Sequence, residues 1–368
     1  MKFTITRRGL LWGLLLAALA ALALGRRGET SMERGGLAMN TVVRISAVGP
    51  ERGALSAALD EAFALLASLD GELSLYSEGS ALSRVNRAAG GAVPVPVPPD
   101  VFAAVSRAAE AHALTAGVFN PLIGPITKIW KINQAPDDRR ACALPSQASL
   151  DQALRLTDMA GLELFPEGEG GPALRLARPG ATLDLGGIAK GCASSRIAAL
   201  LGERGVKSAL IDLGGNIQVM GPGPGGEAWH IGVRDPLAPE GETLLTLTVE
   251  DAAVVTSGGY ERYKVIDGVR YSHFFDPRTG RPARNDMLSA TLVTPDGPLA
   301  DARATAFMIR GSERAMELLR ARRDLRAVLV RRRGGGAVED GLTPEDIEIL
   351  ATENLRGNVQ SRRQVQYF

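Results

Sequence analysis

Hydrophobic residues along this chain recur with two spacings, one helical and one alternating. Apolar side chains three or four positions apart predict amphipathic helices, here over residues 54–68, 100–115, 149–157, 300–308 and 312–320. Alternation of apolar and polar residues, or a short apolar run between turn residues, predicts strands. These strands are expected at residues 41–48, 209–213, 217–220, 229–233, 243–249, 253–256, 289–294 and, as the last one, 327–330.

The order of these elements indicates the fold class. Strands and helices do not alternate regularly as they do in a βαβ fold. We therefore expect an α+β fold with mixed, largely antiparallel sheets and packed helices. Residues 73–80 are expected to end a strand and enter a polar turn, and residues 174–176 are expected to pair with residues 182–184 as strands.

The first 27 residues have the composition of an export signal. Arg7 and Arg8 precede an apolar run from Leu10 to Leu24, which is shorter than the ~20 residues that usually span a bilayer. We expect residues 1–27 to be a signal peptide or an uncleaved membrane anchor. The arginine pair fits a twin-arginine signal as well as an ordinary secretory one. The body is then exported and periplasmic, either free or tethered to the inner membrane.

The remaining chain divides into a main domain and two minor segments. Residues 28–355 are expected to form the main domain, in one lobe or two, after a linker at residues 26–37. Residues 133–146 are polar and contain proline, which predicts a surface insertion. Residues 356–368 are expected to be a frayed polar tail.

Composition excludes several classes of protein. The formal net charge is +1, so no overall field attracts nucleic acid, and we expect no nucleic-acid partner. Cys142 and Cys192 are the only cysteines, too few for a disulfide framework. No cluster of histidine and cysteine has the spacing of a zinc site.

A glycine-rich corner at residues 182–191 is the first candidate for chemistry. Gly186 and Gly187 precede a helix with one apolar face, and the start of a helix offers free N–H groups and a positive dipole end that suit an anion. Lys190 would oppose that dipole unless a phosphate also binds there, and Asp184 would hold a polar part of the same ligand. The alternative is an ordinary strand–turn–helix corner with a solvated lysine.

Other segments place polar or aromatic groups in loops. Tyr76 at a strand end suits stacking on a flat ring, and the loop at residues 118–120 offers backbone groups to the edge of a ring. His273 leads into the turn at residues 276–280, where a histidine is a candidate general base or phosphate partner. Each of these also has a purely structural explanation when it is taken alone.

A fourth segment suits a hard metal ion. Asp301 and Thr305 are four residues apart at the start of a helix, so their oxygens share one face. Together with a backbone carbonyl they suit Mg²⁺, which keeps its other positions for phosphate oxygens and water. The combined segments describe a site for a pyrophosphate-containing nucleotide with a flat ring.

The order of these motifs resembles the ApbE-type flavin transferases, the FAD:protein FMN transferases. The most specific matching elements are His-x-x-Asp-Pro-Arg-Thr-Gly at residues 273–280 and Ala-Asp-x-x-Ala-Thr at residues 300–305. The resemblance spans nearly the whole chain after the leader, and it implies an ApbE-like (T-fold-like) core. The other matching segments are residues 39–41, 73–76, 117–125 with Trp130, 184–191, 212–215, 256–258 and 271–272.

The resemblance implies a magnesium-dependent enzyme with FAD as its substrate. Such an enzyme transfers FMN to a threonine or serine hydroxyl of an exported or membrane redox protein and releases AMP. The resemblance implies that Mg²⁺ binds the Gly187 carbonyl, Asp301 and Thr305, and that His273 assists the acceptor hydroxyl. It implies that FAD contacts Met39, Tyr76, Val118, Phe119, Asn120, Asp184, Lys190 and Phe275.

The chain departs from the family pattern at three positions. Asn40 stands where a glycine is usual, and Asn120 and Ser195 stand where aspartates are usual. The change at Asn120 is the one expected to alter flavin contacts, and it removes no metal ligand. Two other activities remain open: an FAD pyrophosphatase that releases FMN and AMP with the same residues, and a non-catalytic FAD-binding protein.

Overall fold

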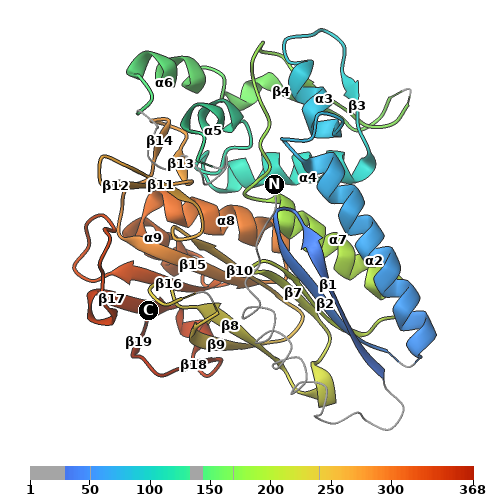
Figure 1. The fold of residues 1–368 in the computed structure, drawn as a ribbon, viewed down its shortest axis with the longest axis vertical. Coiled ribbons are helices and arrows are strands. Elements are labelled where there is room, and N and C mark those ends of the chain that lie inside the picture. The colour runs from blue at the N-terminus through green and yellow to red at the C-terminus, as the bar shows by residue number, and fades with distance from the viewer. Residues whose placement is uncertain (1–29, 50, 133–143, 169, 240) are drawn as a thin grey trace.

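The structure is a computed structural model that describes residues 30–49, 51–132, 144–168, 170–239 and 241–368. Within these residues the main sheet has nine strands (Figure 1). Neighbouring strands are antiparallel, except the last pair, which is parallel. The expected α+β fold is therefore confirmed. The spatial order is β1 (Thr30–Ala38), β2 (Thr41–Gly49), β6 (Ser208–Leu213), β7 (Asn216–Met220), β10 (Ala253–Gly258), β15 (Met287–Thr294), β16 (Arg326–Arg332), β17 (Ile347–Ala351) and β19 (Val365–Tyr367).

Helices cover one face of this sheet. Helix α7 lies between α2 and α8, and the apolar stripe of α2 packs with Val43, Ile45 and Ala47 of β2 in one core. Alternation along β10 decides which side chains meet the helices, so that Val255 and its partner Leu292 join the core beneath α8. The covering helices are α2 (Arg52–Leu73), α4 (Pro99–Leu114), α7 (Ala189–Glu203), α8 (Gly297–Arg310) and α9 (Ser312–Ala321).

A small sheet packs on the opposite face. It contains β8 (Trp229–Arg234), β9 (Thr243–Val249) and β18 (Val359–Ser361), in the order β18-β9-β8. Val254 and Val293, which alternate with the helix-facing pair, share a core with Ile231 and Leu247 of this small sheet. The long strands β10 and β15 are thus buried on both faces.

Most of the remaining elements are short, and they lie in the upper half of the view in Figure 1, beyond the main sheet. Trp130, Leu150 and Phe275 form a separate core that holds several of these short elements together. They are α3 (Ala81–Arg87), α5 (Gly124–Trp130), α6 (Gln147–Leu154), the sheet of β3 (Val95–Pro96), β5 (Ala173–Leu176) and β4 (Leu162–Phe165), and the hairpins β11 (Tyr263–Ile266) with β12 (Val269–Ser272) and β13 (Phe275–Asp276) with β14 (Arg281–Pro282). Short 3₁₀ turns lie at Met159–Gly161, Pro224–Gly226, Pro344–Asp346 and Glu353–Leu355.

Two N-terminal expectations were wrong. Residues 30–37 of the expected linker belong to β1, which pairs along its whole length with β2. The sequence signal is weak because β1 is a half-exposed edge strand. Leu73, expected in a strand, is the last residue of α2, because Leu69 and Leu73 continue the buried stripe of the helix across Gly71.

The predicted pairing of residues 174–176 with residues 182–184 was also wrong. Strand β5 pairs with β3 and β4 instead. Residues 182–184 belong to no strand. Asn86 holds them in place of a strand partner, since its amide donates to Leu183 O (3.0 Å) and accepts from Leu183 N (2.7 Å).

The C-terminal expectation was wrong as well. Strands β17, β18 and β19 follow residue 330, and residues 359–361 and 365–367 are paired with β9 and β17 rather than frayed. The polar composition of this segment hid alternating side chains, because Val365 and Tyr367 pack against the core of the small sheet while Gln366 between them is exposed.

Some sequence expectations fall outside the described residues. The leader at residues 1–27, residues 133–143 of the predicted insertion and Cys142 belong to this part of the chain. Among the residues that the structure does describe, no helix combines the length and the apolar character that crossing a bilayer requires.

Candidate active site

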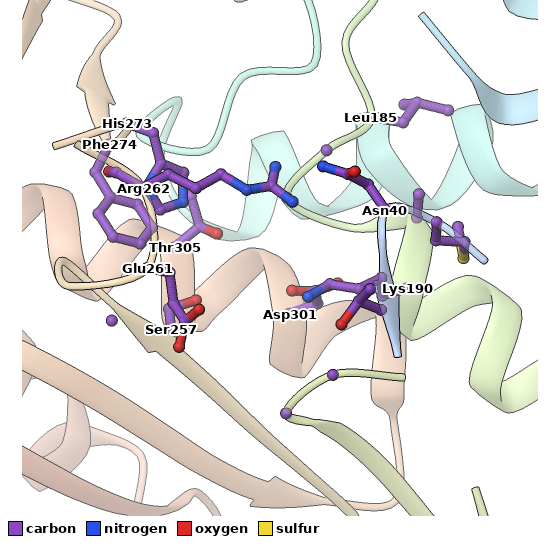
Figure 2. A pocket seen from close by; sticks show the side chains of 18 of the residues that line it. Asn40, Leu185, Lys190, Ser257, Glu261, Arg262, His273, Phe274, Asp301 and Thr305 are labelled. Atoms are coloured by element: carbon purple, nitrogen blue, oxygen red, sulfur yellow. The ribbon is translucent and has the colours of Figure 1, made fainter. Parts of the chain in front are cut away.

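The loops at one end of the main sheet enclose a cleft of about 950 Å³. The β1–β2 turn, the glycine corner before α7, the end of β10, the segment before β13 and one face of α8 contribute to its walls (Figure 2). The structure thus brings together segments that are far apart in the sequence. Every site residue expected from the resemblance lines this cleft: Met39, Tyr76, Val118, Phe119, Asn120, Asp184, Gly187, Lys190, His273, Phe275, Asp301 and Thr305.

Asp184 begins the glycine corner and is held at both carboxylate oxygens. Oδ1 accepts a hydrogen bond from Gly186 N (2.9 Å), and Oδ2 accepts one from Thr127 Oγ1 (3.0 Å). The Asp184 N–H donates to Pro121 O (2.8 Å). The glycine corner and the loop before α5 are therefore one hydrogen-bonded unit, and Asp184 has a fixed position in the wall of the cleft.

Gly187 lies directly against α8. A Cβ atom at this position would be 3.1 Å from Thr305 Oγ1 and 3.2 Å from Phe119 Cε2, which is tighter than ordinary contact. A side chain here would force Thr305 or Phe119 to shift by a few tenths of an ångström, so glycine favours this close approach of the backbone. Within the described residues, Thr305 Oγ1 has no hydrogen-bond partner, so the hydroxyl remains available to a ligand beside the Gly187 backbone.

Asp301 is a buried carboxylate with few partners. Asp301 is only 5% exposed, and its Oδ2 accepts one hydrogen bond, from Gly191 N (3.1 Å). Burial raises the pKa of the Asp301 carboxyl, and the charge of Lys190, the Gly191 N–H and the Asn216 amide act against this rise. A buried carboxylate at neutral pH is stabilised by a cation. Lys190, half-buried in the first turn of α7, points toward the same space in Figure 2.

The donor set around Asp301 fits a hard divalent cation. Asp301, Thr305 Oγ1 and the Gly187 carbonyl would supply oxygens, which Mg²⁺ prefers. The buried Asn216 Nδ2 makes no hydrogen bond of ordinary geometry, although it is near enough to lower the pKa of Asp301. Nowhere in the described residues do three or more His, Cys, Asp or Glu side chains form a metal-binding group, so a metal here would also need oxygens from its ligand.

His273 has the protonation state of a base. Its Nδ1 is 3.0 Å from Arg262 O, and because a carbonyl only accepts, Nδ1 carries the hydrogen and Nε2 keeps its lone pair. Burial lowers the pKa of His273 to about 4. The imidazole is therefore neutral at pH 7, and Nε2 carries the lone pair.

The loop at residues 118–120 is fixed by side chains on both sides. Phe119 O is 2.9 Å from His112 Nδ1, and Phe119 N donates to Thr115 Oγ1 (3.1 Å). The Asn120 amide donates to Thr157 O (2.9 Å) and accepts from Leu122 N (2.8 Å). Since both polar atoms of the Asn120 side chain hold the loop, the asparagine shapes this wall.

The remaining expected contacts lie at the rim and in the wall. Met39 and Asn40 form the β1–β2 turn, both with left-handed backbone (φ 49° and 58°). Tyr76 is 63% exposed at the rim, where a flat ring can stack on it. The Phe275 ring is buried beside Trp130, with ring centroids 6.1 Å apart, so it belongs to the packed wall.

Sequence reasoning missed several polar residues of the cleft. Arg234, Glu261 and Arg262 line it (Figure 2 shows the latter two), and the Asn216 amide lowers the pKa of Asp301. The available signal was the pair Glu261-Arg262, which follows Gly258-Gly259-Tyr260 in a segment between two matching motifs. The buried pairing of Ser194 Oγ with Asn216 Oδ1 (3.0 Å) has no sequence signal, because it joins α7 to β7.

Comparison with known proteins agrees with this geometry. The model of the ApbE family matches residues 39–329. The chain belongs to the ApbE family. The matched range contains all of the cleft residues expected from the sequence, and it ends inside β16.

Relatives and solved structures of the ApbE family cover most of the chain. A protein of Treponema pallidum named FAD:protein FMN transferase is 38% identical over 307 residues, which are 80% of this chain and 83% of the relative. One of the same name from Klebsiella pneumoniae is 34% identical and covers 73% of this chain and 80% of the relative. The structure of the flavin transferase ApbE from Vibrio cholerae is 26% identical, with a TM-score of 0.74 over 90% of this chain and 99% of that one.

Proposed function

We propose that this ApbE-family protein transfers FMN from FAD to a threonine or serine hydroxyl of an acceptor protein and releases AMP, with the help of Mg²⁺. The convergence of a neutral His273, the half-buried Lys190 and the Asp301–Thr305–Gly187 oxygens in one cleft carries the proposal. This set supplies a base, a cation and a metal position, as phosphoryl transfer requires. The name of the relatives supports the same reaction.

The transfer is a substitution at the flavin-side phosphorus of FAD. The acceptor hydroxyl oxygen forms a bond to this phosphorus, and the bond from the phosphorus to the bridging oxygen breaks. AMP leaves with that oxygen and the electron pair, while the hydroxyl proton moves to His273 Nε2. The geometry at Nδ1 keeps this nitrogen free for the proton.

The chain's own residues position the substrate for this step. Tyr76 at the rim would stack on the isoalloxazine ring, and Lys190 would neutralise part of the pyrophosphate charge. Asp301, Thr305 and the Gly187 carbonyl would hold Mg²⁺. When bound, the ion would neutralise charge on the pyrophosphate oxygens.

The leader and the resemblance support a proposal for the compartment and the acceptor. Residues 1–27 have the character of an export signal, so we propose a periplasmic enzyme, free or tethered to the inner membrane. Its acceptor would then be a membrane or periplasmic redox protein with a threonine or serine flavinylation site.

An intact-mass experiment tests the reaction. Purified protein is incubated with FAD, Mg²⁺ and a candidate acceptor domain, and the acceptor is weighed by mass spectrometry. An increment of the mass of bound FMN, together with free AMP, supports transfer. AMP without the increment on any acceptor identifies a pyrophosphatase, and intact bound FAD identifies a carrier; either result would overturn the proposal.

A further inference from the structure

The segment between β10 and β11 carries a cation that the reaction above does not use. Arg262 lines the cleft, and Figure 2 shows its side chain running from beside His273 toward Asn40. In the part of the chain that the structure describes, its guanidinium has neither an ion pair nor a hydrogen bond. Arg234 in the same cleft is by contrast bonded to Glu261 (2.9 Å) and lies over the Tyr260 ring (4.9 Å). The Arg262 guanidinium is exposed, faces a ligand-sized cleft and forms no ion pair with a described carboxylate. It is therefore available to an anion.

The backbone of Arg262 is anchored to the base. Its carbonyl accepts hydrogen bonds from both His273 N (3.1 Å) and His273 Nδ1 (3.0 Å). Burial is the largest cause of the low pKa of His273, and the Arg262 charge also lowers it, which requires the two groups to be close. The side chains of Arg262 and His273 therefore start from two backbone segments that are hydrogen-bonded to each other.

We propose that Arg262 binds the pyrophosphate of FAD, from the wall that carries His273, while Lys190 approaches from α7. This inference rests on the proposed function and adds a substrate-binding residue to it. A guanidinium offers two parallel N–H donors to two phosphate oxygens, which a lysine cannot do. As the bridging oxygen gains charge during departure of AMP, a cation fixed beside it stabilises the transition state more than the ground state.

Paired ligands separate this role from a structural one. The binding of ADP, which has the pyrophosphate, and of riboflavin, which has none, is measured by calorimetry for the wild type, Arg262→Gln and Arg262→Lys. We expect Arg262→Gln to weaken ADP by about tenfold or more, the usual effect of losing a charged hydrogen bond, and to leave riboflavin unchanged. Arg262→Lys should recover part of the ADP affinity. In transfer assays with FAD, the Arg262→Gln variant should lose turnover as well as affinity.

Arg52→Gln is the matched control. Arg52 is exposed and has no partner among the described residues. It follows the end of β2 away from the cleft, since Thr41 at the other end lines the cleft. This variant should bind both ligands as the wild type does.

The possible results decide the inference. Unchanged ADP binding in Arg262→Gln would overturn it, and so would an equal weakening of ADP and riboflavin, which would mean that Arg262 only shapes the wall. If the wild type binds FAD but flavinylates no acceptor, the proposed function fails. The comparison of ADP with riboflavin still decides the role of Arg262 in that case.

Discussion

Asp301 combines deep burial with a negative charge that few groups compensate. Its pKa in the folded protein lies above the unfolded value, so the ionised carboxylate lowers the stability of the metal-free protein at neutral pH. This contribution grows as pH rises through the raised pKa. A residue that costs stability is retained where it binds a ligand, which agrees with the proposed metal site.

Asp301→Asn should separate stability from function. The amide oxygen can still accept from Gly191 N, so we expect the metal-free variant to unfold at the same temperature as the wild type or a higher one, and to be inactive. Mg²⁺ at a hundredfold excess over its Kd, together with an FAD analogue, should raise the free energy of unfolding of the wild type by about 2.7 kcal/mol. The same addition should leave the variant unaffected. Calorimetric melting curves with and without the metal measure both effects.

Asp267→Asn provides the control for the loss of charge. Asp267 is exposed in the turn between β11 and β12, and asparagine tolerates its left-handed backbone. Its melting temperature and its response to Mg²⁺ should match those of the wild type. Full activity of Asp301→Asn would reject the metal site.

His273 should stay neutral over an unusually wide pH range. Because burial lowers its pKa to about 4, the neutral form persists well below the ordinary pKa of about 6.5, and it is lost only as pH falls through the lowered value. ¹⁵N NMR of the imidazole should show a neutral ring with hydrogen at Nδ1 at pH 6, assigned by the signals that disappear in His273→Gln. A ring that is half protonated near pH 6.5 would contradict this.

His273→Ala should affect the chemical step more than binding. Turnover should fall by about a hundredfold or more, the usual contribution of a positioned base, while the affinity for FAD changes little. Stopped-flow transfer rates and equilibrium binding measure the two quantities separately. Equal losses in both would argue against a chemical role.

Helix α7 carries Lys190 and helix α8 carries Asp301. The spacing of the two helices depends on the contact of Gly191 in α7 with Gly297 and Pro298 in α8. A Cβ on Gly191 would lie 2.6 Å from Gly297 O and 2.9 Å from Pro298 Cα, closer than real Cβ contacts. The glycine is therefore required by packing between the helices, and through them it sets the spacing of the charged groups in the cleft.

Gly191→Ala should push the two helices apart. We expect a loss of about 1–3 kcal/mol in the free energy of unfolding, as for other overpacked sites, together with weaker Mg²⁺ binding. Gly202→Ala in the same helix is the control, because the nearest atom to its Cβ is 3.9 Å away. That substitution should be neutral or stabilise by up to about 1 kcal/mol. Chemical denaturation measures both, and equal stability of the two variants would refute the packing argument.

Helices and interior strands were the elements that the sequence predicted best. Helix α2 and strands β6, β7 and β15 carry apolar residues at the expected spacing, and they were confirmed with shifts of a few residues at their ends. Strand β1 was missed because an edge strand buries little. Residues 182–184 were misread because Asn86 replaces the strand partner, a side-chain contact that no periodicity reveals.

The cleft forms only when the whole chain is folded, and periodicity alone would not have found it. Gly191 in α7 and Asp301 in α8 are 110 positions apart in the sequence, yet Gly191 N donates a hydrogen bond to Asp301 Oδ2. The resemblance to the family, carried by the motifs, predicted which residues would line the cleft together. Asn216 and Ser194 belong to no motif, and Arg262 had only the weak signal of its place between two motifs, so the three-dimensional arrangement was needed to place all three.

Removing the last two strands should destabilise the fold without changing the cleft. A chain that ends at Gly357 lacks β18 and β19, which leaves the edges of β9 and β17 unpaired, and open edges promote association. We expect a melting temperature lower by several degrees and aggregation on heating, with FAD binding retained in the cold. Arg362→Ala, at an exposed position without a partner in the described chain, should behave as the wild type in light scattering.

The β1–β2 hairpin has a consequence for how nucleotide leaves the protein. Strand β1 is bonded to the sheet through β2 alone, and its turn carries the cleft residues Met39 and Asn40. Such a peripheral hairpin can fray while the central strands stay closed. In the proposed reaction, the spent nucleotide would then leave on that side without disturbing the proposed metal position on α8, and the cleft would be ready for the next FAD once the turn closes again.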